Sequence, residues 1–273
     1  MITRPIPSTG EALPVIGMGT WQTFDVAGSS AHPSLQKVLE TMHNAGGRLI
    51  DSSPMYGNSE KVIGDITHNM AARDDFFYAT KVWTTGKQEG IRQMESSFHK
   101  MKRTTIDLMQ IHNLTDWKTH LPVLQQWKQS GKIRYTGVTH YTDSSHDNLE
   151  QVIRKEKTDF VQFNYSLLSR HAEKRLLPAA ADSGVATIIN RPFGEGAYFK
   201  KIAGKSLPSW ASDYAINSWA AYFLKFIISH PAVTCVIPAT ASPEHALENF
   251  NAGEGALPDA AGRNKMIAWI EGL

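Results

Sequence analysis

Short runs of apolar residues, rich in β-branched and aromatic side chains, recur along the whole chain with segments of helical spacing between them. Runs that are apolar at nearly every position are typical of parallel strands covered on both faces. The pattern therefore predicts eight strands, at Pro14–Trp21, Arg48–Ser52, Phe76–Val82, Thr105–His112, Tyr135–His140, Phe160–Asn164, Ala186–Pro192 and Thr234–Ala239.

The segments between these runs place their apolar residues at the spacing of an amphipathic helix. Residues Ser34–Ala45 and Leu121–Ser130 each bring their apolar side chains onto one face, as a helix that packs on a sheet requires. Several such segments stop at a glycine just before the next strand, as at Gly131 and Gly184, and glycine is common just past a helix C-terminus.

Eight strand-then-helix units in about 250 residues are typical of a TIM barrel, so we predict an α/β fold, a (β/α)8 barrel in one domain, residues 1–273. The alternative, a doubly wound sheet, needs a Gly-rich turn after its first strand. The first run instead gives Gly17–Trp21, without the third glycine or a following helix. We also expect an N-terminal β-hairpin turning at Ser8–Glu11 over one barrel end, and an extra C-terminal helix after Gly253–Gly262.

The composition narrows the range of functions. Of the 273 residues, 41% are hydrophobic and 20% are charged, which favours a large core and excludes disorder. Lys and Arg number 28 against 26 Asp and Glu, and without a basic run we expect no nucleic-acid partner. A single cysteine, Cys235, excludes an intrachain disulfide and a multi-cysteine metal site, and its apolar run predicts a core position.

Nothing in the sequence indicates a membrane or an export route. No stretch reaches 18 consecutive apolar residues, so we expect no membrane span and no membrane partner. Residues 1–17 lack a basic segment followed by an apolar run, so no signal peptide is predicted. We therefore expect a cytoplasmic protein, as a monomer or a weak oligomer.

Four polar residues fall at or just after consecutive predicted strand ends: Asp51, Tyr56, Lys81 and His112. Chemistry in a barrel is located where its strands end, and neighbouring strands lie about 4.8 Å apart, so these side chains can converge. An aspartate and a lysine inside apolar strands are costly unless each neutralises the other. Taken singly, each residue has a structural explanation; their alignment on consecutive strands favours a functional one.

The combination suits the protonation of an alkoxide that forms when a carbonyl accepts hydride. A tyrosine hydroxyl has an ordinary pKa of about 10, and a nearby Lys81 ammonium is expected to lower it. Asp51 would keep the lysine charged and oriented. His112 could hydrogen-bond a carbonyl oxygen beside Tyr56.

These motifs resemble the aldo-keto reductase family over nearly the whole chain. Asp51–Gly57 resembles the family's Asp-x4-Tyr-Gly signature, and Lys81 and His112 stand where the family completes its Asp/Tyr/Lys/His tetrad. Further similarity lies at Gly17–Trp21, Gly131–Val138, Val161–Tyr165 and Ile237–Asn249. The resemblance implies an oxidoreductase that binds NAD(P)H in an extended form and reduces an aldehyde or ketone to the alcohol.

The resemblance also implies residue roles. Tyr56 would be the general acid, Lys81 the partner that shifts its pKa, Asp51 the anchor of that lysine and His112 the residue that orients the substrate. Gln162 would bind the nicotinamide carboxamide. The full cofactor set implied is Gly19, Thr20, Trp21, Asp51, Thr139, His140, Gln162, Asn190, Arg191, Pro192, Phe193, Gly194, Thr240, His245, Glu248 and Asn249.

Two departures from the family pattern concern the nicotinamide. Where the family has Ser-Asn after its fifth strand, this chain has Thr139-His140, which keeps a hydroxyl and a hydrogen-bonding ring. Where the family often stacks an aromatic residue on nicotinamide, the chain has Asn190, so the ring must be held differently, with Phe193 a candidate. Arg191 is well placed to meet the pyrophosphate, since its guanidinium is planar and permanently charged. A surface salt bridge is the alternative role for it.

A third departure concerns the choice of cofactor. Many family members place Lys-Ser after the eighth strand, and later an arginine, to hold the 2′-phosphate of NADPH. This chain has Ala239-Thr240 and His245 there, so an alanine and a mostly neutral histidine replace two cations. The family favours NADPH, while these residues leave room for NADH. Glu248 and Asn249 keep the family pattern and could hold the adenine.

The substrate pocket is expected to combine apolar walls with a few polar groups. The predicted aromatic and apolar wall consists of Trp21, Phe24, Met55, Trp83 and Trp117. The expected partner is thus a small-molecule carbonyl substrate. Two alternatives stay open: a cofactor-loaded interaction module with little turnover, and a metal-dependent barrel hydrolase. The histidines form no His-x-His or His-Glu-x-x-His motif, which disfavours the hydrolase and predicts no metal site.

Overall fold

The computed structural model describes all 273 residues and contains ten strands and ten α-helices. The strands are β1 Thr3–Pro5, β2 Ala12–Pro14, β3 Met18–Gly19, β4 Leu49–Asp51, β5 Phe77–Val82, β6 Ile106–Ile111, β7 Ile133–Thr139, β8 Phe160–Asn164, β9 Ala186–Asn190 and β10 Cys235–Val236. The helices are α1 His32–Asn44, α2 Ser59–Thr67, α3 Lys87–Lys100, α4 Trp117–Gln129, α5 His146–Lys155, α6 Leu176–Asp182, α7 Ala197–Lys201, α8 Trp219–Ile228, α9 Pro243–Asn251 and α10 Ala260–Glu271.

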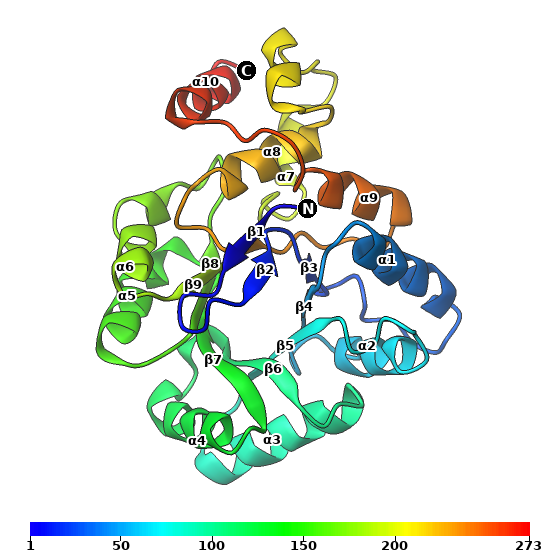
Figure 1. Cartoon of the computed structure of the whole chain (residues 1–273), viewed down its shortest axis with the longest axis vertical. Coiled ribbons are helices and arrows are strands. Elements are labelled where there is room, and N and C mark those ends of the chain that lie inside the picture. The colour runs from blue at the N-terminus through cyan, green and yellow to red at the C-terminus, as the bar shows by residue number, and fades with distance from the viewer.

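Eight parallel strands, β3 to β10, form one sheet in sequence order, and helices surround it (Figure 1). Parallel bridges from Ile16 to Val236 and from Gly19 to Ala239 join the first strand of this sheet to the last. The predicted (β/α)8 barrel is therefore confirmed, with α10 as the predicted extra helix.

The first and last barrel strands are shorter than the apolar runs predicted. Within the run Pro14–Trp21 the barrel strand is only the two-residue β3, and within Thr234–Ala239 it is only β10. Hydrogen bonds still cross between them, from Gly17 N to the Val236 carbonyl at 2.9 Å and from Gly19 N to the Pro238 carbonyl at 3.1 Å. Pro238 has no N–H to return, which interrupts the ladder. Gly17 fits because a Cβ there would lie 2.8 Å from the Leu49 carbonyl oxygen.

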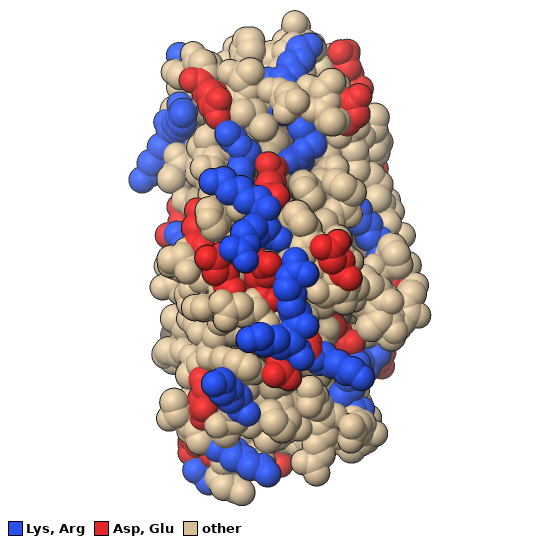
Figure 2. Space-filling model, turned by 90° about the vertical axis from the view of Figure 1, so that its left-hand side faces the viewer, with Lys and Arg blue, Asp and Glu red and all other residues tan.

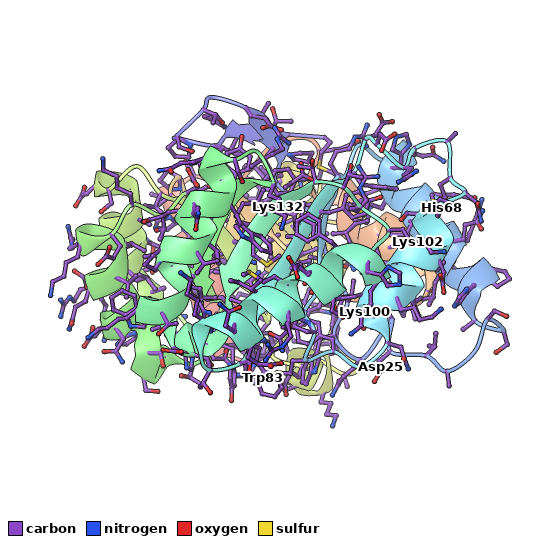
Figure 3. All side chains as sticks on the ribbon, turned by 90° about the horizontal axis from the view of Figure 1, so that it is seen from below. Asp25, His68, Trp83, Lys100, Lys102 and Lys132 are labelled. Carbon is purple, nitrogen blue, oxygen red and sulfur yellow. The ribbon has the colours of Figure 1, made fainter.

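The predicted hairpin is present, and it closes the end of the barrel where the strands begin. β1 and β2 pair antiparallel, and the side chains of Ile6 and Leu13 join a buried cluster with inward residues of the barrel strands, among them Phe77 and Phe160. Figure 3 shows the barrel from the side, with the hairpin at the top and Trp83, which follows β5, at the opposite end. The open end of the barrel is therefore the end where the strands finish.

The outer surface carries charges of both signs. On the face in Figure 2, acidic and basic side chains are interspersed. Ion pairs lie within and between neighbouring elements on the outside of the barrel, as where Glu150 in α5 pairs with Arg154 of the same helix and with Arg175 just before α6. None of the helices combines the length and the apolar composition that crossing a membrane requires.

Candidate active site

A cavity of about 560 Å³ opens where the barrel strands end, and the turns and loops after six of them, together with Gln162 inside β8, contribute to its lining. Its lining includes three of the four residues predicted to act together: Asp51, Tyr56 and His112. The fourth, Lys81, lies fully buried beneath them, with its Nζ 5.1 Å from the centre of the Tyr56 ring. The structure thus brings the four side chains to one place.

Lys81 is held by two acceptors inside the barrel. Its Nζ donates to Asp51 Oδ2 at 2.7 Å and to the Ser52 carbonyl at 2.7 Å. Burial lowers the pKa of the Lys81 ammonium, but the negative charge of Asp51 and the nearby Tyr56 outweigh burial and hold that pKa above its ordinary value. The lysine therefore stays charged, as the sequence suggests.

The other oxygen of Asp51 is held by two glutamine side chains. Oδ1 accepts from Gln162 Nε2 at 3.0 Å and from Gln110 Nε2 at 3.1 Å. Gln162 in turn accepts from Thr139 Oγ1 at 3.1 Å through its Oε1. Side chains from β5, β6 and β8, with Thr139 of β7 behind Gln162, therefore fix the carboxylate at the end of β4. Gln110 is a member of this group that the sequence motifs do not indicate.

The pKa of the Tyr56 hydroxyl is shifted in the direction opposite to the one that the sequence predicts. Burial raises the pKa of its hydroxyl, and the positive charge of Lys81 opposes this without cancelling it, so the pKa lies above the ordinary value. The sequence predicts the opposite direction, because it shows the lysine but not the extent to which neighbouring residues desolvate the Tyr56 hydroxyl. A raised pKa keeps the hydroxyl protonated near neutral pH, which is the form that a proton donor needs.

His112 is a neutral ring at the edge of the cavity. Burial, with smaller effects of Lys81 and His140, lowers its pKa to about 3. Its Nδ1 lies 2.9 Å from Ser53 Oγ, and its ring meets the Tyr56 ring edge-on at 5.7 Å between centres. The rings of Tyr56 and His112 thus face one region of the cavity.

Most of the residues implied as cofactor contacts border this cavity. Those that line it are Gly19, Thr20, Trp21, Asp51, Thr139, Gln162, Asn190, Arg191, Pro192 and Phe193. Those outside its lining are His140, Gly194, Thr240, His245, Glu248 and Asn249. Asn190 donates through Nδ2 to the His140 carbonyl at 3.3 Å, while its buried Oδ1 has no partner.

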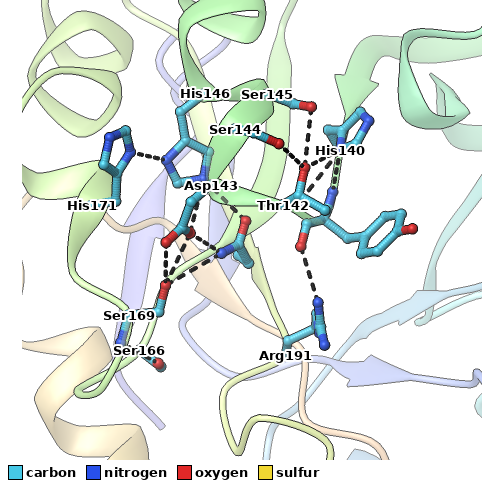
Figure 4. Close-up of polar contacts among 12 residues, drawn as sticks. His140, Thr142, Asp143, Ser144, Ser145, His146, Ser166, Ser169, His171 and Arg191 are labelled. Carbon is cyan, nitrogen blue, oxygen red and sulfur yellow. Dashed lines mark hydrogen bonds and ion pairs between the residues drawn. The ribbon is translucent and has the colours of Figure 1, made fainter.

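In the loop after β7, the side chain of His140 contacts the backbone of the next two residues. Its Nδ1 accepts from the N–H groups of Tyr141 and Thr142 at 3.0 and 3.4 Å, and its ring stacks on the Tyr141 ring (Figure 4). Arg191 reaches the same loop, donating to the Tyr141 carbonyl at 3.3 Å and pairing with Glu195 at 3.0 Å. The Arg191 guanidinium therefore already has a carboxylate beside it at the cavity wall.

The segment after β10 carries no lysine or arginine at the positions singled out from the sequence. Ala239 borders the cavity, Thr240 Oγ1 accepts from the Ser242 N–H, and His245 is exposed in the first turn of α9. Glu248 and Asn249 follow on the same helix, and Asn249 is buried.

The predicted substrate wall divides into residues at the cavity and residues away from it. Trp21 and Met55 line the cavity, and Trp83 lies 6.3 Å from the His112 ring, between ring centres, without lining it. Phe24 is fully buried in the main core, and Trp117 packs against that core. Further lining residues that sequence reasoning does not single out are Gln22, Thr23, Asn113, Tyr141, Glu195, Gly196, Phe199 and Ile237.

The structure contains no group of three or more His, Cys, Asp or Glu side chains placed to hold a metal ion.

The connection after β9, which carries Glu195 and Phe199, contains regular secondary structure. It includes the short helix α7 and a 3₁₀ turn at Ser209–Tyr214. Cys235 is buried in the barrel interior, as predicted.

Comparison with known proteins identifies relatives of this chain. A family model described as the aldo/keto reductase family matches residues 15–262. The NADH-specific methylglyoxal reductase of Escherichia coli (strain K12) is 27% identical over 239 residues, which is 76% of this chain and 72% of that protein. The aldo-keto reductase YhdN of Bacillus subtilis (strain 168) is 26% identical over 201 residues, 67% of this chain and 60% of that protein.

Solved structures show the same fold. An aldo-keto reductase from Klebsiella pneumoniae, determined in complex with NADPH, superposes with a TM-score of 0.81 at 23% identity. The match covers 99% of this chain and 96% of that one. It includes the hairpin, the barrel and the C-terminal helix.

Proposed function

Because the chain belongs to the aldo/keto reductase family, we propose that it reduces an aldehyde or ketone to the alcohol with a nicotinamide cofactor. The observation that supports this function most is the group of Tyr56, Lys81, Asp51 and His112 at one cavity. A protonated hydroxyl, a charged lysine and a neutral imidazole in one place suit the delivery of a proton to a carbonyl oxygen.

In the proposed reaction, Tyr56 acts as the general acid. Its raised pKa keeps the proton on the hydroxyl until negative charge develops on the carbonyl oxygen of the substrate. The Lys81 ammonium beneath the ring stabilises the phenolate left behind, and Asp51 holds that ammonium in position. His112 hydrogen-bonds the same carbonyl oxygen and orients it toward Tyr56.

The residues along the cavity fit a nicotinamide cofactor, which when bound supplies the hydride. The free Oδ1 of Asn190 can accept from the carboxamide, and Gln162 and Thr139 lie on the same side of the cavity. Arg191 would hold phosphate, in competition with Glu195. Glu248 and Asn249 of α9 would hold the adenine.

We propose that the chain uses NADPH but accepts NADH readily. Ala239 and Thr240 offer no charge to a 2′-phosphate, and His245 is the one basic residue type within α9. One similar protein is named as NADH-specific and another was solved with NADPH, so the family includes both behaviours. Fluorescence titration with each cofactor measures the preference directly.

Stopped-flow mixing of the NADPH-loaded protein with a reactive aromatic aldehyde tests the function itself. A reductase oxidises one equivalent of cofactor in a rapid phase and forms the alcohol in equal amount. A binding module of the same fold binds NADPH but shows neither the rapid phase nor the alcohol, and that result would overturn the proposal.

A further inference from the structure

Ser53 contacts the imidazole ring of His112, but it does not line the cavity. It follows β4 two residues after Asp51, and it is completely buried. Its Oγ lies 2.9 Å from Nδ1 of His112 and accepts from the Met55 N–H at 3.2 Å. The neighbouring Ser52 is buried too, but its hydroxyl accepts from Thr20 Oγ1 at 3.1 Å instead. Only one of the two serine hydroxyls therefore meets the histidine.

The hydrogen-bonding capacity of Ser53 decides where the proton of His112 lies. A serine hydroxyl has one proton to donate and two lone pairs that accept. The Met55 N–H occupies one lone pair, and His112 Nδ1 is the sole remaining hydrogen-bond partner of Oγ. If Nδ1 carried the proton and donated it to Oγ, the Ser53 proton would be buried without an acceptor, at a cost of about 1–3 kcal/mol. Ser53 therefore donates, and Nδ1 accepts.

With Nδ1 accepting, a neutral His112 carries its proton on Nε2. That nitrogen has no hydrogen-bond partner within the protein, while the ring borders the cavity beside Tyr56. The Nε2–H group is therefore free to donate to a molecule in the cavity. The opposite tautomer would present a lone pair there and would repel a carbonyl oxygen.

We propose that Ser53 is a positioning residue that fixes His112 as the Nε2–H tautomer, so that the ring donates a hydrogen bond to the substrate carbonyl. This inference rests on the proposed reductase function and adds a residue to it. Ser53 touches neither substrate nor cofactor in this arrangement. It acts through the one proton that it gives to Nδ1.

Substitution Ser53→Ala, with Ser97→Ala as the matched control, tests the proposal. Ser97 is equally buried, but its hydroxyl donates to the Gln93 carbonyl inside α3, and neither of these two residues lines the cavity. Nitrogen-15 NMR of histidine-labelled protein reports the tautomer of each ring, and comparison with a His112→Asn variant assigns the signals of His112. This measurement requires no turnover.

We expect the wild type and Ser97→Ala to show His112 protonated at Nε2 between pH 6 and pH 8. In Ser53→Ala the two tautomers should mix, and kcat/KM for an aldehyde should fall about tenfold while the Kd of NADPH changes less than twofold. Ser53→Thr, which restores the hydroxyl, should recover the Nε2–H signal. Unchanged His112 signals in Ser53→Ala would overturn the proposal.

The two proposals fail in different ways. If the wild type reduces no aldehyde but Ser53→Ala still mixes the tautomers, the reductase function is wrong and the control of His112 by Ser53 stands. If reduction proceeds and the tautomer of His112 does not respond to Ser53, the role of Ser53 is wrong and the function stands.

Discussion

Lys81 Nζ lies 2.7 Å from Asp51 Oδ2 in the barrel interior, and neither side chain is more than 3% exposed. Removing one partner of a buried ion pair typically costs about 3–5 kcal/mol, because the other charge is left uncompensated. We therefore expect Asp51→Asn to lower the free energy of unfolding by about that amount, measured by urea denaturation. The double variant Asp51→Asn with Lys81→Met should regain part of the loss.

The surface pair Arg92–Glu89 provides the control for this prediction. Both of its side chains are largely exposed, and such pairs contribute about 0–1 kcal/mol. Glu89→Gln should therefore leave the urea midpoint nearly unchanged. An Asp51→Asn variant as stable as Glu89→Gln would contradict the importance of the buried pair.

Tyr56→Phe removes the proposed proton donor and leaves the ring in place. Positioned acid catalysis contributes about 10²–10⁴-fold, so we expect kcat to fall by at least 100-fold while the Kd of NADPH stays within about twofold. Tyr135→Phe is the matched control, since that hydroxyl contacts Thr9 and Glu11 at the hairpin end of the barrel. Near-normal turnover in Tyr56→Phe would refute the role of the hydroxyl.

The cofactor preference should respond to two substitutions beyond β10. Ala239→Lys and His245→Arg together supply the cations that the sequence lacks at these positions. A charge-assisted hydrogen bond contributes about 1.5–3 kcal/mol, and each 1.4 kcal/mol is tenfold in affinity. We expect the Kd of NADPH to fall at least tenfold and that of NADH to change little. If the Kd values of NADPH and NADH fell equally, residues 239 and 245 would not be the ones that contact the 2′-phosphate.

Stability should decrease as the pH falls below 6.5. Burial lowers the pKa of His112 to about 3 and, with the charge of Arg263, that of His230 to about 4. Between these values and about 6.5 the unfolded chain binds protons that the folded chain does not, so acid favours unfolding. The stabilisation is fully present above pH 6.5 and is lost progressively toward pH 3.

Thermal unfolding followed by circular dichroism between pH 4 and pH 8 measures this effect. The wild-type Tm should be nearly constant above pH 7 and should fall steadily below pH 6.5. His230→Gln should reduce the slope of the fall, since it removes one of the histidines whose pKa burial lowers in the folded protein. A slope that is identical in wild type and variant would contradict the contribution of His230.

Part of the site can be predicted from sequence because strand ends converge in any closed barrel. Asp51, Lys81 and His112 stand at or near the ends of consecutive apolar runs, so their meeting follows from the fold alone. Gln110 could have been predicted in a similar way, because a buried amide inside an apolar strand needs a polar partner. Alternation along β6 could have located it.

Other features of the site depend on the conformation of individual turns, and the spacing of apolar residues along the sequence does not predict that conformation. Phe24 was predicted at the cavity but lies in the core, because the chain turns back at once and the Phe24 N–H bonds to the Thr20 carbonyl. The contact between Ser53 and His112 joins residues 59 positions apart through a single hydroxyl. The direction of the Tyr56 pKa shift depends on the balance of burial against the charge of Lys81, and that balance depends on the three-dimensional packing around the hydroxyl.

The joining of the first barrel strand to the last has a consequence for how the chain is made. β3 has a partner on one side only until Val236 and Ala239 arrive, after more than four-fifths of the chain has been synthesised. A nascent chain that already holds β3 to β9 therefore has two unpaired strand edges, at β3 and at β9, which are sites for association with other chains. Release of β10 from the ribosome removes both edges in one step.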